Sequence, residues 1–195
     1  RLRCDWSSDV CSSDLSFVLI SAPVCFILGL GFGIWGYLNK TVEGALQPIL
    51  NCMQTLPHFS YLVPIMVLFG VGDHAGAIAT IIFATPPMIR LTILGLRKIS
   101  PDIVDSGLMS GCNKTQLLFK VLIPTARRDI LIGVNQVIMQ CLAMTTIAAF
   151  IGAKGLGFNL KVALNSLEIG KASEIGLCVV LIAVILDKYS LAWAN

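Results

Sequence analysis

The side chains of this chain that could do chemistry are amides placed inside long apolar runs. Asn135, Gln136 and Gln140, together with Met139 and Met144, recur at three- and four-residue spacing and therefore share a broad face of one predicted helix. An amide in hydrocarbon either bonds to a neighbouring helix or contacts a polar substrate, and both interpretations stay open. We take Asn135, Gln136 and Gln140 as candidate lining residues of a transport pathway.

Prolines mark a second candidate region. Pro48, Pro57 and Pro64 interrupt the apolar stretch 45–71. A proline inside a helix deprives a carbonyl of its N–H partner, and lipid cannot replace that partner. The stretch must therefore pack against protein or line a water-filled path, and a kinked packing helix fits as well as a broken pathway helix. Pro57 and Pro64 are the further candidate pathway positions.

Two ionisable side chains accompany these residues. Arg90 precedes Arg97 by seven residues, which places its charge about 10 Å deeper along a helix. A charge left in hydrocarbon costs about 3 kcal/mol or more. Arg90 must therefore reach toward the membrane surface or find a partner; the first interpretation is favoured, and a role in the pathway stays open. His58 has no partner in the sequence, so we interpret it as a hydrogen-bonded packing residue rather than a metal ligand.

The sequence offers no catalytic, cofactor-binding or metal-binding set. Seven cysteines and two histidines fall in no metal-ligand spacing, and no His-Glu-x-x-His or Ser/His/Asp arrangement can be assembled. Gly31-x-Gly33-x-x-Gly36 matches the dinucleotide fingerprint, but no predicted strand precedes it. Residues 111–115 lack the spacing of a phosphate-binding loop. We expect no enzyme and no cofactor, so any energy source must lie in another subunit.

The elements that must carry these residues are membrane-spanning helices. The chain of 195 residues is 56% hydrophobic and 13% charged, against about 25% charged residues in soluble domains. Its net charge of +3 is too small and too scattered to indicate nucleic acid. Because a bilayer needs about 20 apolar residues per helix, the sequence predicts an all-α integral membrane protein with about five transmembrane helices, at 16–38, within 45–71, at 77–96, at 130–151 and around 175–186.

Three of the predicted spans have features that can be read from their sequences. Gly29 and Gly33 in the first should let a neighbouring helix approach closely. Residues 71–76 are predicted to form a short turn before the third. The last apolar run has only 12 residues, so it must include 169–174 or continue past Asp187.

The first fifteen residues differ from the rest. They hold three aspartates, four serines and two cysteines without periodicity, and they lack the apolar middle of a signal peptide. The string resembles a translated sequencing adapter, so we expect a non-native segment at 1–15 and a membrane domain at 16–195 without its natural N-terminus. A genuine polar tail is the alternative. Nothing in 1–15 is expected to span a membrane or cap a helix.

A polar island from Pro101 to Pro124 separates the apolar runs and predicts two short helices. Ser100 and Pro101 suit the start of the first, and Gly111 would end it in a left-handed conformation. Asn113, with Gln116 three residues on, would cap the second, which Pro124 should stop.

One flank of the first short helix is predicted to be nearly free of side-chain bulk. Ile103, Gly107 and Gly111 follow one another at four-residue spacing and therefore share that flank. We expect the surface of another protein to press against it at backbone distance.

The same island resembles the EAA loop of ABC importer permeases, whose pattern is Glu-Ala-Ala-x3-Gly-x9-Ile-x-Leu-Pro. The residues that carry the likeness are Asp105, Ser106, Gly107, Gly111, Val121, Ile123 and Pro124. Asp105 stands for the glutamate with one methylene fewer, and Ser106 and Gly107 stand for the alanines. The resemblance continues over about 16–190, through 53–72, 85–96, 135–144 and 151–157. There the chain is similar to the permease of a glycine betaine/proline (quaternary amine) importer.

The resemblance implies a type I ABC importer transmembrane domain in a prokaryotic cell membrane. The seven residues of the island would form a cytoplasmic helix-turn-helix loop that couples to a separate ATPase. A second permease copy, as a homodimer, and an external solute-binding protein are the other implied partners. Closure of the ATPases on nucleotide would pull the two loops together and reopen the pathway outward.

Lysine and arginine counts agree with a cytoplasmic island. Eight such residues then lie on the inner side, namely Lys40, Arg97, Lys98, Lys114, Lys120, Arg127, Arg128 and Lys188. Three lie outside: Lys154, Lys161 and Lys171. An excess of positive charge marks the cytoplasmic side.

Aromatic residues bear on where a substrate is recognised. Quaternary ammonium groups are best held by aromatic faces, and Tyr61 is the one Trp or Tyr well inside a predicted span. We expect no aromatic cage in the pathway, tight recognition in the binding protein, and a low-affinity path through this chain.

A secondary transporter or channel subunit that is not driven by ATP is the alternative function. The broken second span and Arg90 favour it. Ion coupling requires carboxylates within the membrane, and the sequence predicts none in its apolar spans.

Overall fold

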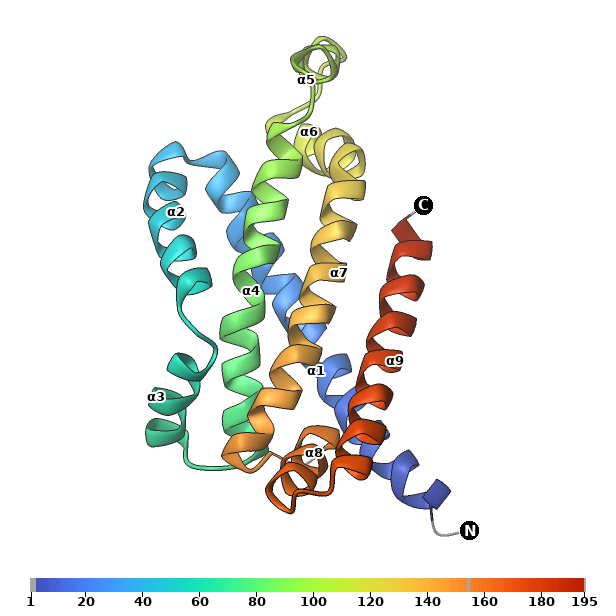
Figure 1. Cartoon of the computed structure of the whole chain (residues 1–195). Helices are drawn as coiled ribbons and strands as arrows, with labels where there is room; N and C mark the ends of the chain where they lie inside the picture. The colour runs from blue at the N-terminus through green and yellow to red at the C-terminus, as the bar shows by residue number, and fades with distance from the viewer. Residues whose placement is uncertain (1–2, 154, 195) are drawn as a thin grey trace.

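The computed structural model describes residues 3–153 and 155–194, and every regular element among them is helical (Figure 1). The α-helices are α1 (Arg3–Leu38), α2 (Lys40–Thr55), α3 (Phe59–Phe69), α4 (Asp73–Arg97), α5 (Pro101–Met109), α6 (Lys114–Leu117), α7 (Ile123–Ala148), α8 (Leu156–Asn165) and α9 (Ile169–Ala194). A π-helical turn, η1 (Leu118–Leu122), precedes α7, and a 3-10 turn, η2 (Ala149–Ile151), follows it. The predicted all-α class is confirmed.

Four helical stretches of the described chain are long and apolar enough to cross a membrane. They run over Asp14–Leu38, Asp73–Arg97, Lys114–Ala148 and Ile169–Ser190. A fifth crossing results if α2 and α3, which meet at a bend of 97°, are counted as one broken span. The prediction of about five transmembrane helices is therefore confirmed, and α9 extends in both of the directions that the sequence left open.

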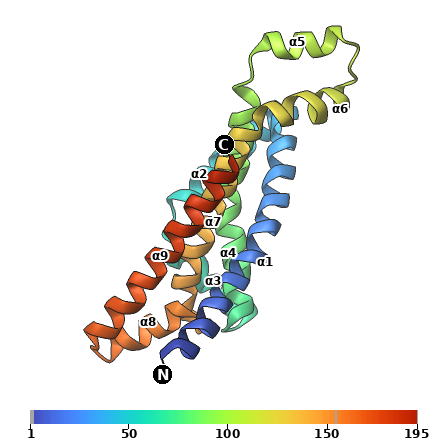
Figure 2. The same ribbon diagram turned by 90° about the vertical axis from the view of Figure 1, so that its right-hand side faces the viewer.

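The helix α4 occupies the middle of the bundle, between α1 on one side and α7 on another (Figures 1 and 2). A Cβ added at Gly29 of α1 would overlap Cγ of Met88, and one at Gly33 would lie 2.6 Å from Cβ of Thr92. These glycines therefore let the two backbones approach closely, as their spacing predicted. A Cβ at Gly133 of α7 would meet Sδ of Met88 at 2.8 Å, so α7 approaches α4 in the same way.

Prolines break the second span at one place. Pro57 lies in the bend between α2 and α3, which favours the broken helix over the kinked helix that the sequence also allowed. Pro48 and Pro64 lie inside α2 and α3, so the prediction that they also interrupt the helix is wrong. The predicted turn at 71–76 is shorter than expected because α4 already begins at Asp73.

Helix α1 includes most of the segment 1–15. Asp14 is buried, and its Oδ2 accepts a hydrogen bond of 2.9 Å from the backbone N–H of Leu156, the first residue of α8. A carboxylate there pairs a free helical N–H and is favoured by the helix dipole. The expectation that nothing in 1–15 can cap a helix is therefore wrong for Asp14. The non-native origin of the segment and the domain boundary at 16 stay predictions.

Candidate translocation pocket and coupling loop

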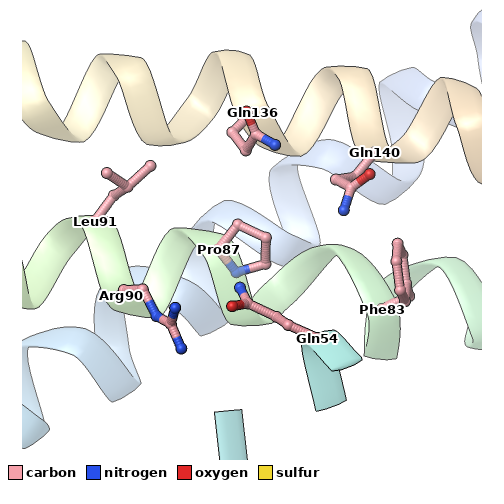
Figure 3. A pocket seen from close by; sticks show the side chains of 7 residues that line it. All are labelled: Gln54, Phe83, Pro87, Arg90, Leu91, Gln136 and Gln140. Atoms are coloured by element: carbon pink, nitrogen blue, oxygen red, sulfur yellow. The ribbon is translucent and has the colours of Figure 1, made fainter. Parts of the chain in front are cut away.

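A pocket of about 360 Å³ lies among three of the helices that cross the bundle. Its lining consists of Gln54 from α2, Phe83, Pro87, Arg90 and Leu91 from α4, and Gln136 and Gln140 from α7 (Figure 3). The volume is that of a small-molecule site, and the lining joins apolar surface to a few polar groups, as such sites do.

Helical spacing places three of these residues on one face of α4. Phe83, Pro87 and Arg90 follow one another at four and three residues. Figure 3 shows Phe83 and Arg90 at opposite ends of the pocket with Pro87 between them. The helical rise separates the two end positions by about 10 Å along the axis. The pocket thus has an aromatic ring at one end and a cation at the other.

Arg90 has an amide partner rather than an acidic one. Its Nη2 donates a hydrogen bond to Oδ1 of Asn51 on α2. Among the described residues, no carboxylate lies within ion-pairing distance of this guanidinium. A guanidinium carries five donors in a fixed fork, so donors remain for another acceptor. The structure supports a partner on the neighbouring helix α2 over the expectation that Arg90 reaches toward the membrane surface.

An aromatic cluster supports the other end of the pocket. The rings of His58 and Phe83 lie 4.2 Å apart between centroids, and Tyr61 meets Phe83 edge to face at 5.7 Å. The Tyr61 hydroxyl donates to the carbonyl of Met53, which ties the two sides of the α2–α3 bend together. The ring contact bears out the packing role predicted for His58, and the hydrogen bond that was also predicted stays a prediction. Sequence reasoning considered only Trp and Tyr inside the spans and missed Phe83.

The structure divides the predicted pathway residues. Gln136 and Gln140 line the pocket. Asn135 instead binds α9: its Nδ2 donates to Oδ1 of Asp187 at 2.9 Å, and Ser190 donates to its Oδ1. This is the interhelical bonding that the sequence left open.

The two predicted prolines lie apart from the pocket lining. Pro57 is in the bend, and Pro64 is on the surface of α3. Neither contributes a side chain to the pocket among the described residues.

Asp187 of α9 corrects the expectation that the apolar spans hold no carboxylate, and Glu43, just before the predicted span 45–71, is a further buried acid of the bundle. Glu43 of α2 is buried and forms an ion pair with Arg97 at the end of α4. Asp187 lies in the apolar stretch of α9 and accepts the bond from Asn135. Both have partners within the chain, so each performs a structural task that a coupled ion would have to displace.

The polar island projects from one end of the bundle as α5 and α6 (Figures 1 and 2). α5 begins at Pro101 after an extended Ser100, although the Ser100 side chain forms no capping bond, and Gly111 follows it at φ +78°. The backbone N–H of Asn113 donates to Oε1 of Gln116 at 3.1 Å, and Asn113 Oδ1 accepts from Lys114 at 3.2 Å. The two-helix prediction and its second cap are confirmed.

Pro124 does not stop the second short helix, contrary to expectation. The chain continues from α6 through η1 into α7, where Pro124 occupies the first turn. A proline inside an α-helix clashes with the carbonyl four residues before it, here that of Lys120. The wider π turn over Leu118–Leu122 shifts this carbonyl away, and the helix passes through.

The Gly107 flank of α5 is not open to a partner. Gly107 is buried, and a Cβ there would lie 2.5 Å from Cδ1 of Leu117 and 3.7 Å from Cγ2 of Val121. The expectation of a bulk-free docking flank is therefore wrong at Gly107, which this chain's own α6 and η1 cover, whereas Ile103 and Gly111 remain exposed. The side of the loop that remains exposed carries Ile103, Asp105, Ser106, Leu108, Met109 and Phe119.

The remaining residues of the predicted motif lie in α5 and at the start of α7. Ser106 Oγ donates to the carbonyl of Asp102 at 2.7 Å, which secures the first turn of α5. Ile123 is half-buried and Pro124 is exposed where α7 begins. The role of these residues in coupling stays a prediction.

The family model described as "Binding-protein-dependent transport system inner membrane component" matches residues 26–190. The chain belongs to this family. The resemblance to ABC importer permeases is thereby confirmed, and the chain is a membrane component of a transport system rather than an enzyme. The alternative of a secondary transporter or channel subunit that is not driven by ATP is therefore not favoured.

Curated relatives of this inner membrane component carry informative names. The chain is 62% identical to the trimethylamine N-oxide transport system permease protein TmoV of Pelagibacter ubique. The alignment of 181 residues covers 93% of this chain and 25% of that protein. It is 41% identical over 178 residues to the glycine betaine/proline betaine transport system permease protein ProW of Escherichia coli, covering 91% and 50%. The chain thus spans a quarter to a half of the length of these relatives.

Solved structures of transporters share the fold of this inner membrane component. An inward-facing MetNI methionine ABC transporter chain superposes with a TM-score of 0.85 at 17% identity and covers 96% of this chain and 94% of its own. A chain of an amino acid ABC transporter gives 0.78 at 15% identity, covering 93% and 89%. The predicted type I importer transmembrane fold is confirmed.

Proposed function

We propose that this chain is the permease unit of an ATP-driven importer for small zwitterionic methylated amines. Trimethylamine N-oxide and glycine betaine, for which the 62% and 41% identical relatives are named, are the first candidates. The observation that carries the proposal is a polar pocket between membrane-crossing helices in a chain that also has a projecting helical loop at one end.

Proline ranks below these compounds. The expectation of proline transport draws its support from the proline betaine in the name that two relatives share. Proline betaine carries a quaternary nitrogen, as glycine betaine does, whereas free proline does not. We therefore place the fully methylated zwitterions first.

The proposed complex needs partners that this chain lacks. They are a cytoplasmic ATPase, an external solute-binding protein and a second permease unit, which we propose to be a copy of this chain. The junction of α1 and α2, the α5–α6 loop and the end of α9 lie toward the same end of the bundle (Figure 1). These segments, with the adjoining ends of α4 and α7, carry the eight cationic residues counted above, which supports a cytoplasmic position for that end.

The loop is built to transmit movement to the pocket. α6, η1 and α7 form one helical stretch from Lys114 to Ala148, and this stretch carries Gln136 and Gln140. α5 is joined by a short connection to α4, which carries Phe83 and Arg90. An ATPase that moves the loop therefore acts on both walls of the pocket as rigid bodies.

Uptake by the reconstituted complex tests the proposal. The permease, the ATPase and the binding protein encoded beside it are placed in vesicles, and labelled trimethylamine N-oxide and glycine betaine are offered. We expect uptake that requires ATP, the binding protein and a substrate of this class. Uptake driven by an ion gradient without ATP would instead establish the secondary transporter, and ATP-dependent uptake of unrelated solutes only would refute the substrate class.

A further inference from the structure

We propose that the pocket between α2, α4 and α7 is a low-affinity substrate site with a defined polarity. One methylated-amine zwitterion lies in it with its anionic oxygen on Arg90 and its methylated ammonium against Phe83. This inference rests on the proposed function and adds where the substrate binds and how it is oriented.

The cationic end of the pocket suits a carboxylate or an N-oxide oxygen. Arg90 lines the pocket, gives a hydrogen bond to Asn51, and has no carboxylate partner among the residues that the structure describes. Its remaining donors can bind an anionic oxygen in charge-assisted hydrogen bonds, which are roughly twice as strong as neutral ones. An uncompensated guanidinium between membrane helices is costly, and an anionic ligand group offsets that cost.

The aromatic end suits the methylated nitrogen. A trimethylammonium group has no hydrogen to donate, so it gains from an aromatic face and from apolar surface. Phe83 and Pro87 supply these on the same face of α4. His58 and Tyr61 contact the Phe83 ring and hold it in place.

The walls of the pocket are neutral between the two ends. The amides of Gln54, Gln136 and Gln140 line them, and none of these side chains carries a charge. Figure 3 shows the two α7 glutamines on one side of the α4 face and Gln54 on the other. A ligand with separated charges therefore has one favoured orientation, along α4.

One ring and one guanidinium predict weak binding. Tight recognition of quaternary amines uses several aromatic rings around one ligand, and this pocket has Phe83 alone among its lining residues. A transport site must also release its ligand, so weak binding suits the task. Calorimetry on the permease–ATPase complex without the binding protein should therefore detect no micromolar betaine site.

Two probes separate the two ends of the site. Saturation-transfer NMR on the permease–ATPase complex reports millimolar binding of glycine betaine, which has both charges, and of tetramethylammonium, which has only the cation. Arg90→Gln should weaken betaine binding by about tenfold or more and leave tetramethylammonium binding no weaker. Phe83→Leu should weaken both probes by about fivefold.

Asn51→Ala is the matched control, because it removes the hydrogen bond to Arg90 and leaves the guanidinium in the pocket. It should bind both probes like wild type. Equal losses in Asn51→Ala and Arg90→Gln would show that Arg90 only positions α2 and would overturn the proposal. Should Arg90→Gln fail to assemble, Arg90→Lys keeps the charge without the fork, and it should still distinguish betaine from tetramethylammonium.

Uptake assays separate failure of the site from failure of the proposed function. If the wild-type complex transports betaine but both pocket variants bind and transport it with unchanged KM and selectivity, the site is refuted and the function stands. If the wild-type complex transports neither compound with ATP, the proposed function itself fails.

Discussion

Helix α4 and the α2–α3 pair both contain prolines in the middle of a membrane span, yet only one of them bends. α4 continues through Pro86 and Pro87, whereas α2 and α3 part at Pro57 with an angle of 97°. A proline removes the same donor in each case. The difference therefore comes from what surrounds the helix.

Packing accounts for the contrast. Fourteen of the 25 residues of α4 are buried, and α1 and α7 approach it closely through Gly33 and Gly133. In α2 and α3 the buried residues are Glu43, Leu50, Leu62 and Ile65. Packing on several sides supports α4 where its prolines remove hydrogen bonds, and the bend at Pro57 has no such support, although Pro48 and Pro64 remain inside their helices. The pocket lies where α4 faces α2, next to the α2–α3 bend.

The largest expected effect is at the α1–α4 contact. Gly33→Leu should destabilise the permease by about 3 kcal/mol or more, because its Cβ would lie 2.6 Å from that of Thr92. Gly31→Leu, two residues away on the same helix, is the control, since a Cβ there meets nothing within 4 Å. Thermal unfolding in detergent measures both. Equal melting temperatures would refute the claim that this contact holds α4.

A smaller loss of stability is expected when the ion pair that joins the N-terminal part of α2 to α4 is broken. Glu43→Gln should cost about 1–2 kcal/mol, because the Glu43 side chain is 10% exposed while that of Arg97 is 48% exposed. A double-mutant cycle with Arg97→Gln measures the pair. Lys171→Gln, which breaks the exposed pair with Glu168, should change stability by less than about 0.5 kcal/mol. A coupling energy between Glu43 and Arg97 no larger than the effect of Lys171→Gln would show that this ion pair does not hold α2 against α4.

The contact of Gly107 in the projecting helix α5 should affect coupling to the ATPase more than the stability of the permease. Gly107→Leu would place Cβ 2.5 Å from Leu117, and α5 can relieve the clash by moving away from η1. We expect ATP-dependent uptake to fall about tenfold while the melting temperature stays near that of wild type. Adding Leu117→Ala should restore uptake.

Gly111→Leu provides a comparison at the same loop. Its φ of +78° disfavours any side chain by about 1 kcal/mol, so it should also reduce uptake. Leu117→Ala should not restore that variant, since no contact lies within 4 Å of Gly111. Rescue of both variants, or of neither, would show that the Gly107–Leu117 contact does not determine coupling.

The smallest effect is expected at the bend itself. Pro57→Ala should leave the angle between α2 and α3 unchanged, because Leu62 and Ile65 pack in the core and Tyr61 binds the Met53 carbonyl. The distance between spin labels at Gln47 and Val67 measures the angle. A longer distance would show that proline, not packing, sets the bend.

The spans and the close approach of Gly29 and Gly33 could be predicted because hydropathy and small residues act locally. The roles of Asn135 and Arg90 could not, since each depends on a partner distant in sequence, Asp187 and Asn51. The amide pattern on α7 predicted two pocket residues, Gln136 and Gln140.

Phe83 and Gly107 show two further limits of sequence reasoning. Phe83 has no polar atom to mark it in an apolar run, so nothing in the pattern distinguished it from packing residues. Gly107 has the spacing of a docking flank, but nothing in the sequence indicates that Leu117 of α6 packs against it.

The π turn between α6 and α7 also sets the angle at which the α5–α6 loop projects around the axis of α7. Each residue of an α-helix turns the chain by about 100°, and a π turn holds one residue more than an α turn between its bonded ends. Deleting Phe119, an exposed member of that turn, would therefore rotate the loop by about a quarter of a circle around the α7 axis while leaving Gln136 and Gln140 facing the pocket. Homologous chains that differ by one residue in this turn should accordingly present a different side of the loop to their ATPase.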